Sequence, residues 1–272
     1  MDIYEEISRL RRAGIKAALA TIVNVRGSIP SYESAKLLVR EDGSIVGTVG
    51  GGCVEAEVWT AARKVIEEEK PRKLTFNLNN NPSYDTGLLC GGTLDIFVEP
   101  ILPTPYLYIF GAGHVSMALS KVATLAGFST IIIDDRDTYA NRERFPEAAE
   151  IYADDYEKIF ERLLPNSSSF LIAVTRGHRD DMRVLRWAIG TAARYIGMIG
   201  SKRKVIEIVK YLEENEGIAA AQLARVHSPI GLDIGAISPE EIAVSIVAEM
   251  IAVRRGALQD AKPHPKSILA VS

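Results

Sequence analysis

The chain has 272 residues, a length that fits one large domain or two ordinary ones, and we expect two. Its 32 basic and 35 acidic side chains give a formal net charge of −3, which excludes the basic electrostatic footprint of a dedicated nucleic-acid-binding protein. Hydrophobic residues make up 47% and charged residues 25%, so the chain can bury a large core and is not intrinsically disordered.

The N-terminal residues and the cysteines bear on the compartment. The first fourteen residues, MDIYEEISRLRRAG, lack the basic-then-apolar order of a signal peptide, and no apolar run approaches the length that spans a bilayer. We therefore expect a cytoplasmic protein with no membrane span. Two cysteines cannot form a disulfide framework, so in this compartment we expect free thiols.

The first hundred residues predict a small α+β domain. Residues 2–13 have the apolar spacing of an amphipathic helix, and Gly14 supplies a C-cap. Short β-branched or apolar runs, separated by turn-forming residues, then predict strands. In chain order we expect strands at 17–25, 36–39 and 45–48, a helix from about Val54, and strands at 73–78 and 93–98.

Three prolines within residues 99–105 mark the expected domain boundary, because proline stiffens the backbone and cannot donate a ladder hydrogen bond. We take residues 1–100 as the first domain and 105–272 as the second. In the second domain apolar runs alternate with helical stretches, which predicts a Rossmann-like doubly wound parallel sheet. The expected strands are 106–110, 129–133, 170–174 and 195–198, and the expected helices lie near 115–126, 155–164, 180–190, 202–215 and 239–255.

The last helix has a clear start and a broad apolar stripe. Ser238-Pro239-Glu240-Glu241 combines a capping box with proline at the first helical position. The stripe that follows must pack either on the sheet or on another subunit. A homodimer is therefore one of two interpretations of this helix.

A glycine-rich turn opens the second domain. Gly111-Ala112-Gly113 follows the first strand and precedes a helix, where such a turn lets a phosphate approach the backbone. The next strand ends in Asp134-Asp135, about twenty residues later, where an acidic group meets a ribose hydroxyl in the dinucleotide fingerprint. Ser116 stands in place of the third glycine. A Rossmann fold with an altered or vacant nucleotide site is the alternative.

Polar residues also follow the later strands of this domain. His114 and His178 fall at strand ends, where they could contact a ligand, shuttle a proton or cap a backbone group. Residues 200–204, Gly-Ser-Lys-Arg-Lys, place three cations in the first turn of a helix, where the macrodipole disfavours positive charge. A phosphate over that turn would explain the cations, and a solvated basic helix start is the alternative.

Metal-binding patterns are missing from the sequence. It contains no His-x-x-x-His, Cys-x-x-Cys or His-Glu pattern, so we expect no protein-held metal site.

Residues 225–235 form a long connection with two glycines and several hydrogen-bonding side chains, including His227. Connections of this kind often close over a site.

Both cysteines lie beside glycines. Gly50-Gly51-Gly52-Cys53 stands where a strand gives way to a helix, and Cys90 precedes two glycines and a strand. Glycine permits close approach of a bulky ligand, and a helix N-terminus favours the thiolate, so Cys53 is the better candidate nucleophile. The alternative for either cysteine is a buried small apolar side chain. Arg26, in a turn ahead of Pro30, suits a phosphate or carboxylate unless the turn is an ordinary hairpin.

Taken together, these segments resemble the XdhC/CoxI family of molybdenum-hydroxylase accessory proteins over nearly the whole chain. In the first half the resemblance rests on Arg26-Gly-Ser-Ile-Pro30, on residues 42–55 (DGSIVGTVGGGCVE) and on residues 87–92 (GLLCGG). In the second half it rests on residues 109–115 (IFGAGHV), 134–136 (DDR), 145–146 (FP), 175–178 (TRGH), 195–203 (YIGMIGSKR) and 227–236 (HSPIGLDIGA).

The resemblance implies a chaperone that binds the molybdenum cofactor, molybdopterin, and keeps it while a cysteine desulfurase supplies the terminal sulfido ligand. It further implies delivery of the cofactor to a xanthine-dehydrogenase-like molybdenum hydroxylase apoenzyme. On this reading Cys53 and Cys90 contact the metal or sulfur transiently, and the crevice holds the pterin phosphate or a second nucleotide. The residues expected to bind the cofactor are Arg26, Gly51, Gly52, Gly111, Gly113, His114, Asp134, Asp135, Arg136, Arg176, His178, Ser201, Lys202 and Arg203.

Two other functions stay open. An NAD(P)-dependent oxidoreductase, with the first half as a substrate cap, is consistent with Gly111, Gly113 and Asp134. No Tyr-x-x-x-Lys pair adjoins the crevice to carry the hydride-transfer chemistry. A nucleotide-sensing regulatory protein would bind the same ligand and change its assembly without turnover.

Overall fold

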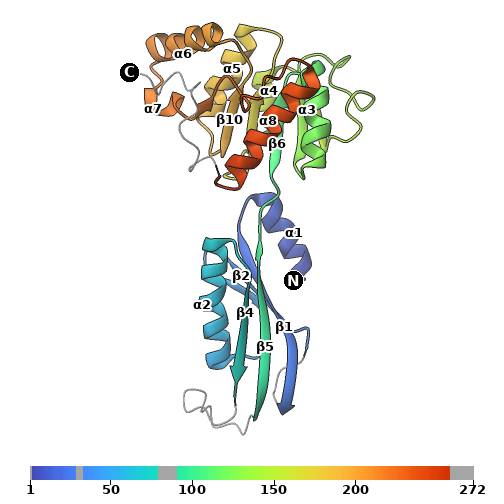
Figure 1. The fold of residues 1–272 in the computed structure, drawn as a ribbon, viewed down its shortest axis with the longest axis vertical. Helices are drawn as coiled ribbons and strands as arrows, with labels where there is room; N and C mark the ends of the chain where they lie inside the picture. The colour runs from blue at the N-terminus through green and yellow to red at the C-terminus, as the bar shows by residue number, and fades with distance from the viewer. Residues whose placement is uncertain (1, 29–32, 79–90, 258–272) are drawn as a thin grey trace. The chain divides into compact units, whose positions relative to one another are not determined.

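The computed structural model describes residues 2–28, 33–78 and 91–257, and the chain divides into two compact units, Met1–Thr104 and Pro105–Ser272 (Figure 1). The first unit contains an antiparallel sheet and the second a parallel one. This confirms the predicted fold class, a small α+β domain followed by a Rossmann-like doubly wound sheet.

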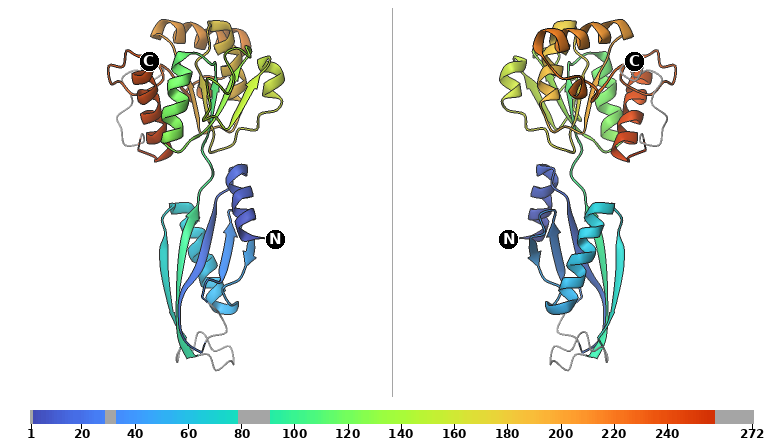
Figure 2. Two further views of the ribbon diagram at one scale, coloured as in Figure 1. Left: turned by 90° about the vertical axis from the view of Figure 1, so that its right-hand side faces the viewer. Right: turned by 90° about the vertical axis from the view of Figure 1, so that its left-hand side faces the viewer.

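The first unit is a five-stranded sheet in the order β3-β2-β1-β5-β4. Alternate residues of its central strand face opposite ways, so Ala18 and Ala20 pack against one helix and Leu19 packs on the side of the other (Figure 2). Its elements are α1 (Ile3–Ala13), β1 (Ala17–Ser28), β2 (Lys36–Arg40), β3 (Ile45–Gly47), α2 (Gly52–Glu68), β4 (Arg72–Asn77) and β5 (Gly91–Ile101).

Strand β5 extends beyond its predicted end at residue 98 into the proline-rich segment. It continues to Ile101, and Pro100 pairs with Ala18 of β1. The pairing of β5 with β4 reaches only as far as Val98, so Pro100 lies beyond the end of that neighbour. A proline is tolerated there because the donor it lacks has no strand to meet.

The second unit is a six-stranded parallel sheet in the order β11-β10-β9-β6-β7-β8. From β6 the chain adds strands first on one side, β7 and β8, and then on the other, starting with β9, so the strand order reverses between β6 and β9. Its strands are β6 (Tyr106–Phe110), β7 (Ser129–Asp134), β8 (Glu150–Ala153), β9 (Phe170–Ala173), β10 (Tyr195–Met198) and β11 (Val226–His227). Its helices are α3 (His114–Leu125), α4 (Tyr156–Phe160), α5 (His178–Ile189), α6 (Lys202–Glu216), α7 (Ala220–Leu223) and α8 (Pro239–Arg254). The predicted helices and strands are all present, whereas β8, β11 and α7 were not predicted.

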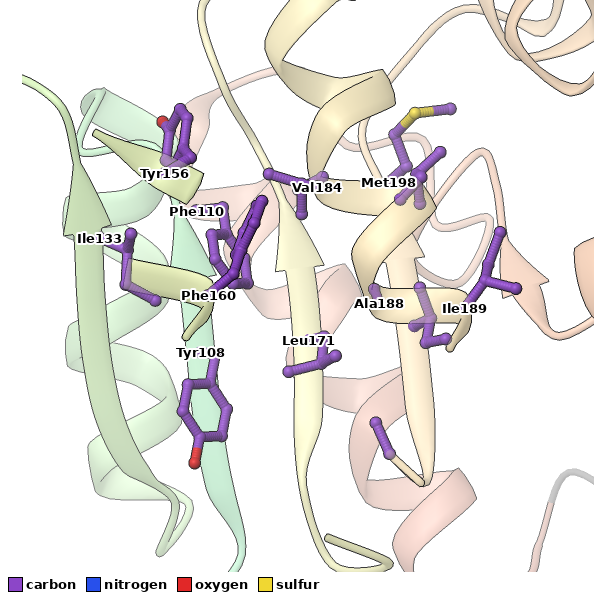
Figure 3. Packing of buried hydrophobic residues seen from close by; sticks show 14 of the residues in the cluster. Tyr108, Phe110, Ile133, Tyr156, Phe160, Leu171, Val184, Ala188, Ile189 and Met198 are labelled. Atoms are coloured by element: carbon purple, nitrogen blue, oxygen red, sulfur yellow. The ribbon is translucent and has the colours of Figure 1, made fainter. Parts of the chain in front are cut away.

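Two apolar clusters cover the two faces of this sheet. Tyr108 and Phe110 of β6 face the cluster formed with α4, α5 and α6, and Figure 3 shows them on the same side as Leu171 of β9. Leu107 and Ile109 face the opposite cluster, where α3 and α8 lie side by side (Figure 1). Every strand of the sheet centre is therefore buried on both faces, as a parallel sheet requires.

The apolar stripe of α8 packs within its own unit. Ser238 and Glu241 form the predicted capping box, and Ala243, Ile246 and Met250 are buried with residues of α3 and the sheet. No second subunit is needed to cover this stripe, so the homodimer stays a prediction without that support. Across residues 2–28, 33–78 and 91–257, no helix is both long and apolar enough to cross a bilayer.

Candidate functional site

The glycine turn lies at the end of β6, beside the point where the strand order reverses. Gly111 has a φ of +107°, and a Cβ there would lie 2.4 Å from the carbonyl oxygen of Val174 at the end of β9. Only glycine fits this close approach. Gly113 caps α3 without a side-chain hydrogen bond, and a Cβ at Gly113 would meet no described residue within 4 Å. The space beside the first turn of α3 is therefore open, and amide donors of a first turn lack intrahelical partners.

Asp134 supports this turn from the end of β7. Its Oδ2 accepts hydrogen bonds from the Ala112 amide and from Arg136 Nη2, both at 2.8 Å. Its Oδ1 accepts from Arg136 Nε at 2.7 Å and from the Arg136 amide at 3.1 Å. Burial raises the pKa of Asp134, but these hydrogen bonds outweigh it and the pKa lies below its ordinary value. The carboxylate is ionised and occupied, with its side chain 2% exposed.

An ion pair connects the ends of the strands that flank β6. Arg176, after β9, contacts Asp135, after β7, at 2.9 Å, and lies 3.9 Å from Asp180. Both members of the main pair are well exposed, and such pairs contribute about 0 to 1 kcal/mol. Little of the stability of the unit therefore depends on this pair. The predicted residues His114 and His178 are exposed at the first positions of α3 and α5, the helices that begin on either side of the reversal.

The basic start of α6 has internal partners. Ser201 caps the helix by accepting from the Lys204 amide at 3.3 Å. The Lys204 ammonium pairs with Asp181, which is fully buried, and Arg203 pairs with Glu207 at 2.9 Å. Carboxylates therefore already balance two of the three cations that the sequence analysis connected with a phosphate. The side chain of Lys202 lies outside what the structure describes.

Sequence reasoning missed a buried carboxylate at the edge of the sheet. Glu249 of α8 accepts from the Tyr195 hydroxyl at 2.7 Å, from the Gly231 amide at 2.6 Å and, at 2.9 Å, meets Nδ1 of His227. Burial raises its pKa, but His227 and Tyr195 together lower it below the ordinary value. Glu249 thereby ties residues 227–231 to α8 and β10. The sequence gives no signal for this carboxylate, because Glu249 lies among the apolar residues of α8 and its partners are distant in sequence.

Cys53 stands at the start of α2 in the first unit. It is a free, exposed thiol that follows three glycines, all with positive φ. Among the described residues, a Cβ at Gly51 or Gly52 would meet nothing within 4 Å, so this part of the structure leaves the backbone before the thiol open to a ligand. Glu55 stabilises the turn, since its Oε2 accepts hydrogen bonds from Thr48 Oγ1 at 2.6 Å and from the Gly51 amide at 3.3 Å.

The other predicted residues of the first unit are less well defined. Cys90 and residues 29–32 lie outside the described residues, so the expectation for the second thiol stays a prediction. Arg26 is exposed on β1. Within the part of the chain that the structure describes, no group of three His, Cys, Asp or Glu side chains could hold a metal ion.

The two units therefore offer different chemistry. The first presents a soft sulfur beside an open backbone, which suits a thiophilic metal or a sulfur-bearing group. The second presents a glycine turn, an open helix start and arginine side chains, which suit an oxyanion.

Comparison with known proteins gives two family matches. Residues 107–250 match the XdhC Rossmann domain, and residues 10–77 match the XdhC and CoxI family. These matches fall in the second and the first unit, respectively.

Individual proteins show the same similarity. Protein YqeB of Escherichia coli (strain K12), which is uncharacterized, is 35% identical over 269 residues, which cover 97% of this chain and 49% of that protein. The chain thus spans about half the length of this relative. The molybdenum cofactor insertion chaperone PaoD of the same organism is 22% identical, over 94% of this chain and 89% of its own length. The solved structure of a xanthine dehydrogenase from Bacillus halodurans has a TM-score of 0.52 and 25% identity, and the match covers 99% of this chain and 100% of that one.

Proposed function

The chain belongs to the XdhC and CoxI family, and from this premise we propose that it is a chaperone in molybdenum cofactor maturation. In this proposal it binds the cofactor, keeps it during sulfuration and delivers it to a molybdenum hydroxylase of the xanthine dehydrogenase type. The cofactor is cargo, a phosphate-bearing pterin with a dithiolene that carries the metal. The similarity to an insertion chaperone, PaoD, supports the choice of cargo.

The observation that carries this proposal is the exposed Cys53 thiol beside an open glycine turn. Thiolates are the ligands that soft metal and sulfur centres prefer. Because Gly51 and Gly52 leave their surroundings free, a bulky pterin can lie against the backbone while the thiol reaches its metal. A buried cysteine would have left the proposal without a contact to the reactive end of the cargo.

Partners follow from the task rather than from any contact in the structure. The proposed client is a molybdenum hydroxylase apoenzyme, and the proposed sulfur donor is a cysteine desulfurase. We also keep a cytoplasmic location and a homodimer as parts of the proposal. A size measurement of the purified chain, with and without cofactor, tests the homodimer.

The central test uses the full chain under anaerobic conditions. Wild-type protein and Cys53→Ser are incubated with molybdenum cofactor, separated by gel filtration and then mixed with a molybdenum hydroxylase apoenzyme. We expect the variant to retain and deliver at least roughly tenfold less cofactor, since it loses the soft ligand. Thr60→Ala, further along the same helix and also exposed, serves as the control and should match the wild type.

Equal retention and delivery by wild-type protein and Cys53→Ser would contradict the role of the thiol. If no cofactor bound to either protein, the chaperone proposal itself would fail. Oxidation of NADH or NADPH coupled to a substrate would instead favour the oxidoreductase alternative.

A further inference from the structure

At the end of β7, arginine side chains surround the position where the dinucleotide fingerprint needs a free carboxylate. In that fingerprint the acidic residue at this strand end accepts a ribose 2′-hydroxyl, whereas a nearby arginine accommodates a 2′-phosphate. Here both oxygens of Asp134 accept hydrogen bonds from Arg136, and one also accepts from the Ala112 amide. The carboxylate has no free face for a ribose diol.

Two guanidinium groups are fixed around one aromatic ring. Arg136 Cζ lies 3.9 Å from the ring centroid of Tyr139, and Arg144 Cζ lies 5.0 Å from it. Arg136 uses Nε and Nη2 for Asp134, so, within residues 2–28, 33–78 and 91–257, its remaining nitrogen Nη1 is left for another acceptor. Cation–π contacts of this kind hold guanidinium groups in place without using their hydrogen-bond donors.

Arg144 also contacts the glycine turn, so the two arginines lie beside that turn. Its Nη2 donates to the Ala112 carbonyl oxygen at 3.1 Å. Its Nε is buried and, within the described part of the chain, has no hydrogen-bond partner. An unsatisfied buried donor is unfavourable, and more so on a charged group, so an acceptor at this position would be bound favourably.

We propose that Arg136 and Arg144 form a subsite for a phosphomonoester beside the glycine turn, and that Asp134 does not serve there as the acceptor for a ribose diol. The inference rests on the proposed function in taking the crevice as a ligand site. Two sources supply this chemistry: the terminal phosphate of the pterin cargo and the ribose phosphate of a nucleotide. A bidentate or paired arginine contact suits either phosphate.

Calorimetric titration of the full chain with four probes tests this subsite: molybdopterin under anaerobic conditions, NADP, NAD and inorganic phosphate. We expect NADP, molybdopterin or both to bind at least roughly tenfold more tightly than NAD, and inorganic phosphate to compete with them. NADP preference alone identifies a nucleotide as the source, and molybdopterin binding alone identifies the pterin.

Variants separate the subsite from general charge effects. Arg136→Gln removes the cation and releases Asp134, so the preference for NADP over NAD should fall to none or reverse. Lys121→Gln, which removes one positive charge from an exposed position of α3, should keep the preference. Because Arg136 also supports the fold, Arg144→Gln is a second variant that should lower phosphate affinity while Asp134 keeps its partners.

NAD binding as tight as NADP and molybdopterin, or an unchanged preference in both arginine variants, would overturn the subsite. So would a wild-type protein that binds none of the four probes. If NADP shows the preference and molybdopterin does not bind, the subsite stands and the crevice is not where the chain holds its cargo. If Cys53→Ser delivered as much cofactor as the wild type, the role of the thiol in the chaperone proposal would fail and the subsite would stand.

Discussion

The glycine turns of the two units differ in what surrounds them. At Gly111-Ala112-Gly113 the amide and the carbonyl oxygen of Ala112 are both bonded, one to Asp134 and the other to Arg144. At Gly50-Gly51-Gly52 a single carboxylate, Glu55, holds the turn from behind, and the thiol that follows is exposed. The turn at Ala112 is thus bonded on both sides to side chains, the buried Asp134 and Arg144, whereas the turn before Cys53 is held by one carboxylate.

Because of this difference, we expect substitutions around Ala112 to change both stability and ligand binding, and substitution of Cys53 to change cofactor binding alone. Asp134, Arg136 and Arg144 bond to one another or to the Ala112 backbone and also form or support the proposed subsite, so we expect that changing them affects both stability and binding. We expect no comparable contribution of Cys53 to the stability of the first unit. The expected effects on the free energy of unfolding therefore fall steadily from the first region to the second.

The largest effect is expected for Asp134→Ala. The substitution leaves the Arg136 guanidinium and the Ala112 amide without their buried acceptor, and we expect a loss of about 3 to 4 kcal/mol in the free energy of unfolding of the second unit. Urea denaturation measures it. Asp135→Asn, which removes the exposed pair with Arg176 and a longer one of 3.8 Å with Arg136, should cost less than about 1 kcal/mol. Equal losses for the two variants would contradict the stabilising role of the buried Asp134 hydrogen bonds.

Gly111→Ala comes next. It places a Cβ against the Val174 carbonyl oxygen at a φ of +107°, for which we expect a cost of about 2 to 3 kcal/mol. The matched control is Gly113→Ala in the same turn, where φ is ordinary and the space is open, and it should stay within about 0.5 kcal/mol of the wild type. Thermal unfolding compares them, and a control as unstable as Gly111→Ala would show that the close approach is not the cause.

Glu249→Gln should cost about 1 to 2 kcal/mol at pH 7, because the amide cannot satisfy all the donors around a buried carboxylate. The folded pKa lies below the ordinary value of 4.5, so the stability that ionised Glu249 contributes is complete above pH 4.5 and is lost as pH falls through the folded pKa. Urea unfolding between pH 7 and pH 3 should show the difference between wild type and variant narrowing. Glu240→Gln, exposed on the same helix, should show no such trend.

The smallest effect on stability is expected for Cys53→Ser. An exposed thiol with open surroundings contributes little, so unfolding should change by less than about 0.5 kcal/mol. Chemical denaturation measures this on the same samples that are tested for cofactor delivery. A loss above about 1 kcal/mol would mean that Cys53 belongs to the fold as much as the crevice residues do.

Local patterns in the sequence predicted most of the fold. Buried parallel strands such as Tyr106–Phe110 are short apolar runs, and a capping box identifies the start of α8, so both signals lie within a few neighbouring residues. Strand β11 gave no such signal, since two residues at the edge of a sheet have no periodicity. The end of β5 was predicted three residues early, because the tolerance of Pro100 in a strand depends on where β4 ends, which is a tertiary property.

The site was predicted less completely for the same reason. The sequence places Asp134 and Lys204 at the correct strand and helix ends, but their partners decide what they do. Lys204 meets a buried aspartate 23 residues away, and Asp134 meets the arginine two residues on. A charged residue at a strand end is therefore a candidate contact until its own hydrogen bonds are known. Glu249, whose hydroxyl partner Tyr195 lies 54 residues away, could not have been found from spacing.

The two bonds at Ala112 determine how this part of the backbone behaves before a ligand arrives. The backbone around Ala112 already loses its conformational entropy on folding, so ligand binding orders it little further. Amide hydrogen exchange at Ala112 should accordingly be slow in the empty protein and change little upon association, while the open first turn of α3 acquires its protection only then.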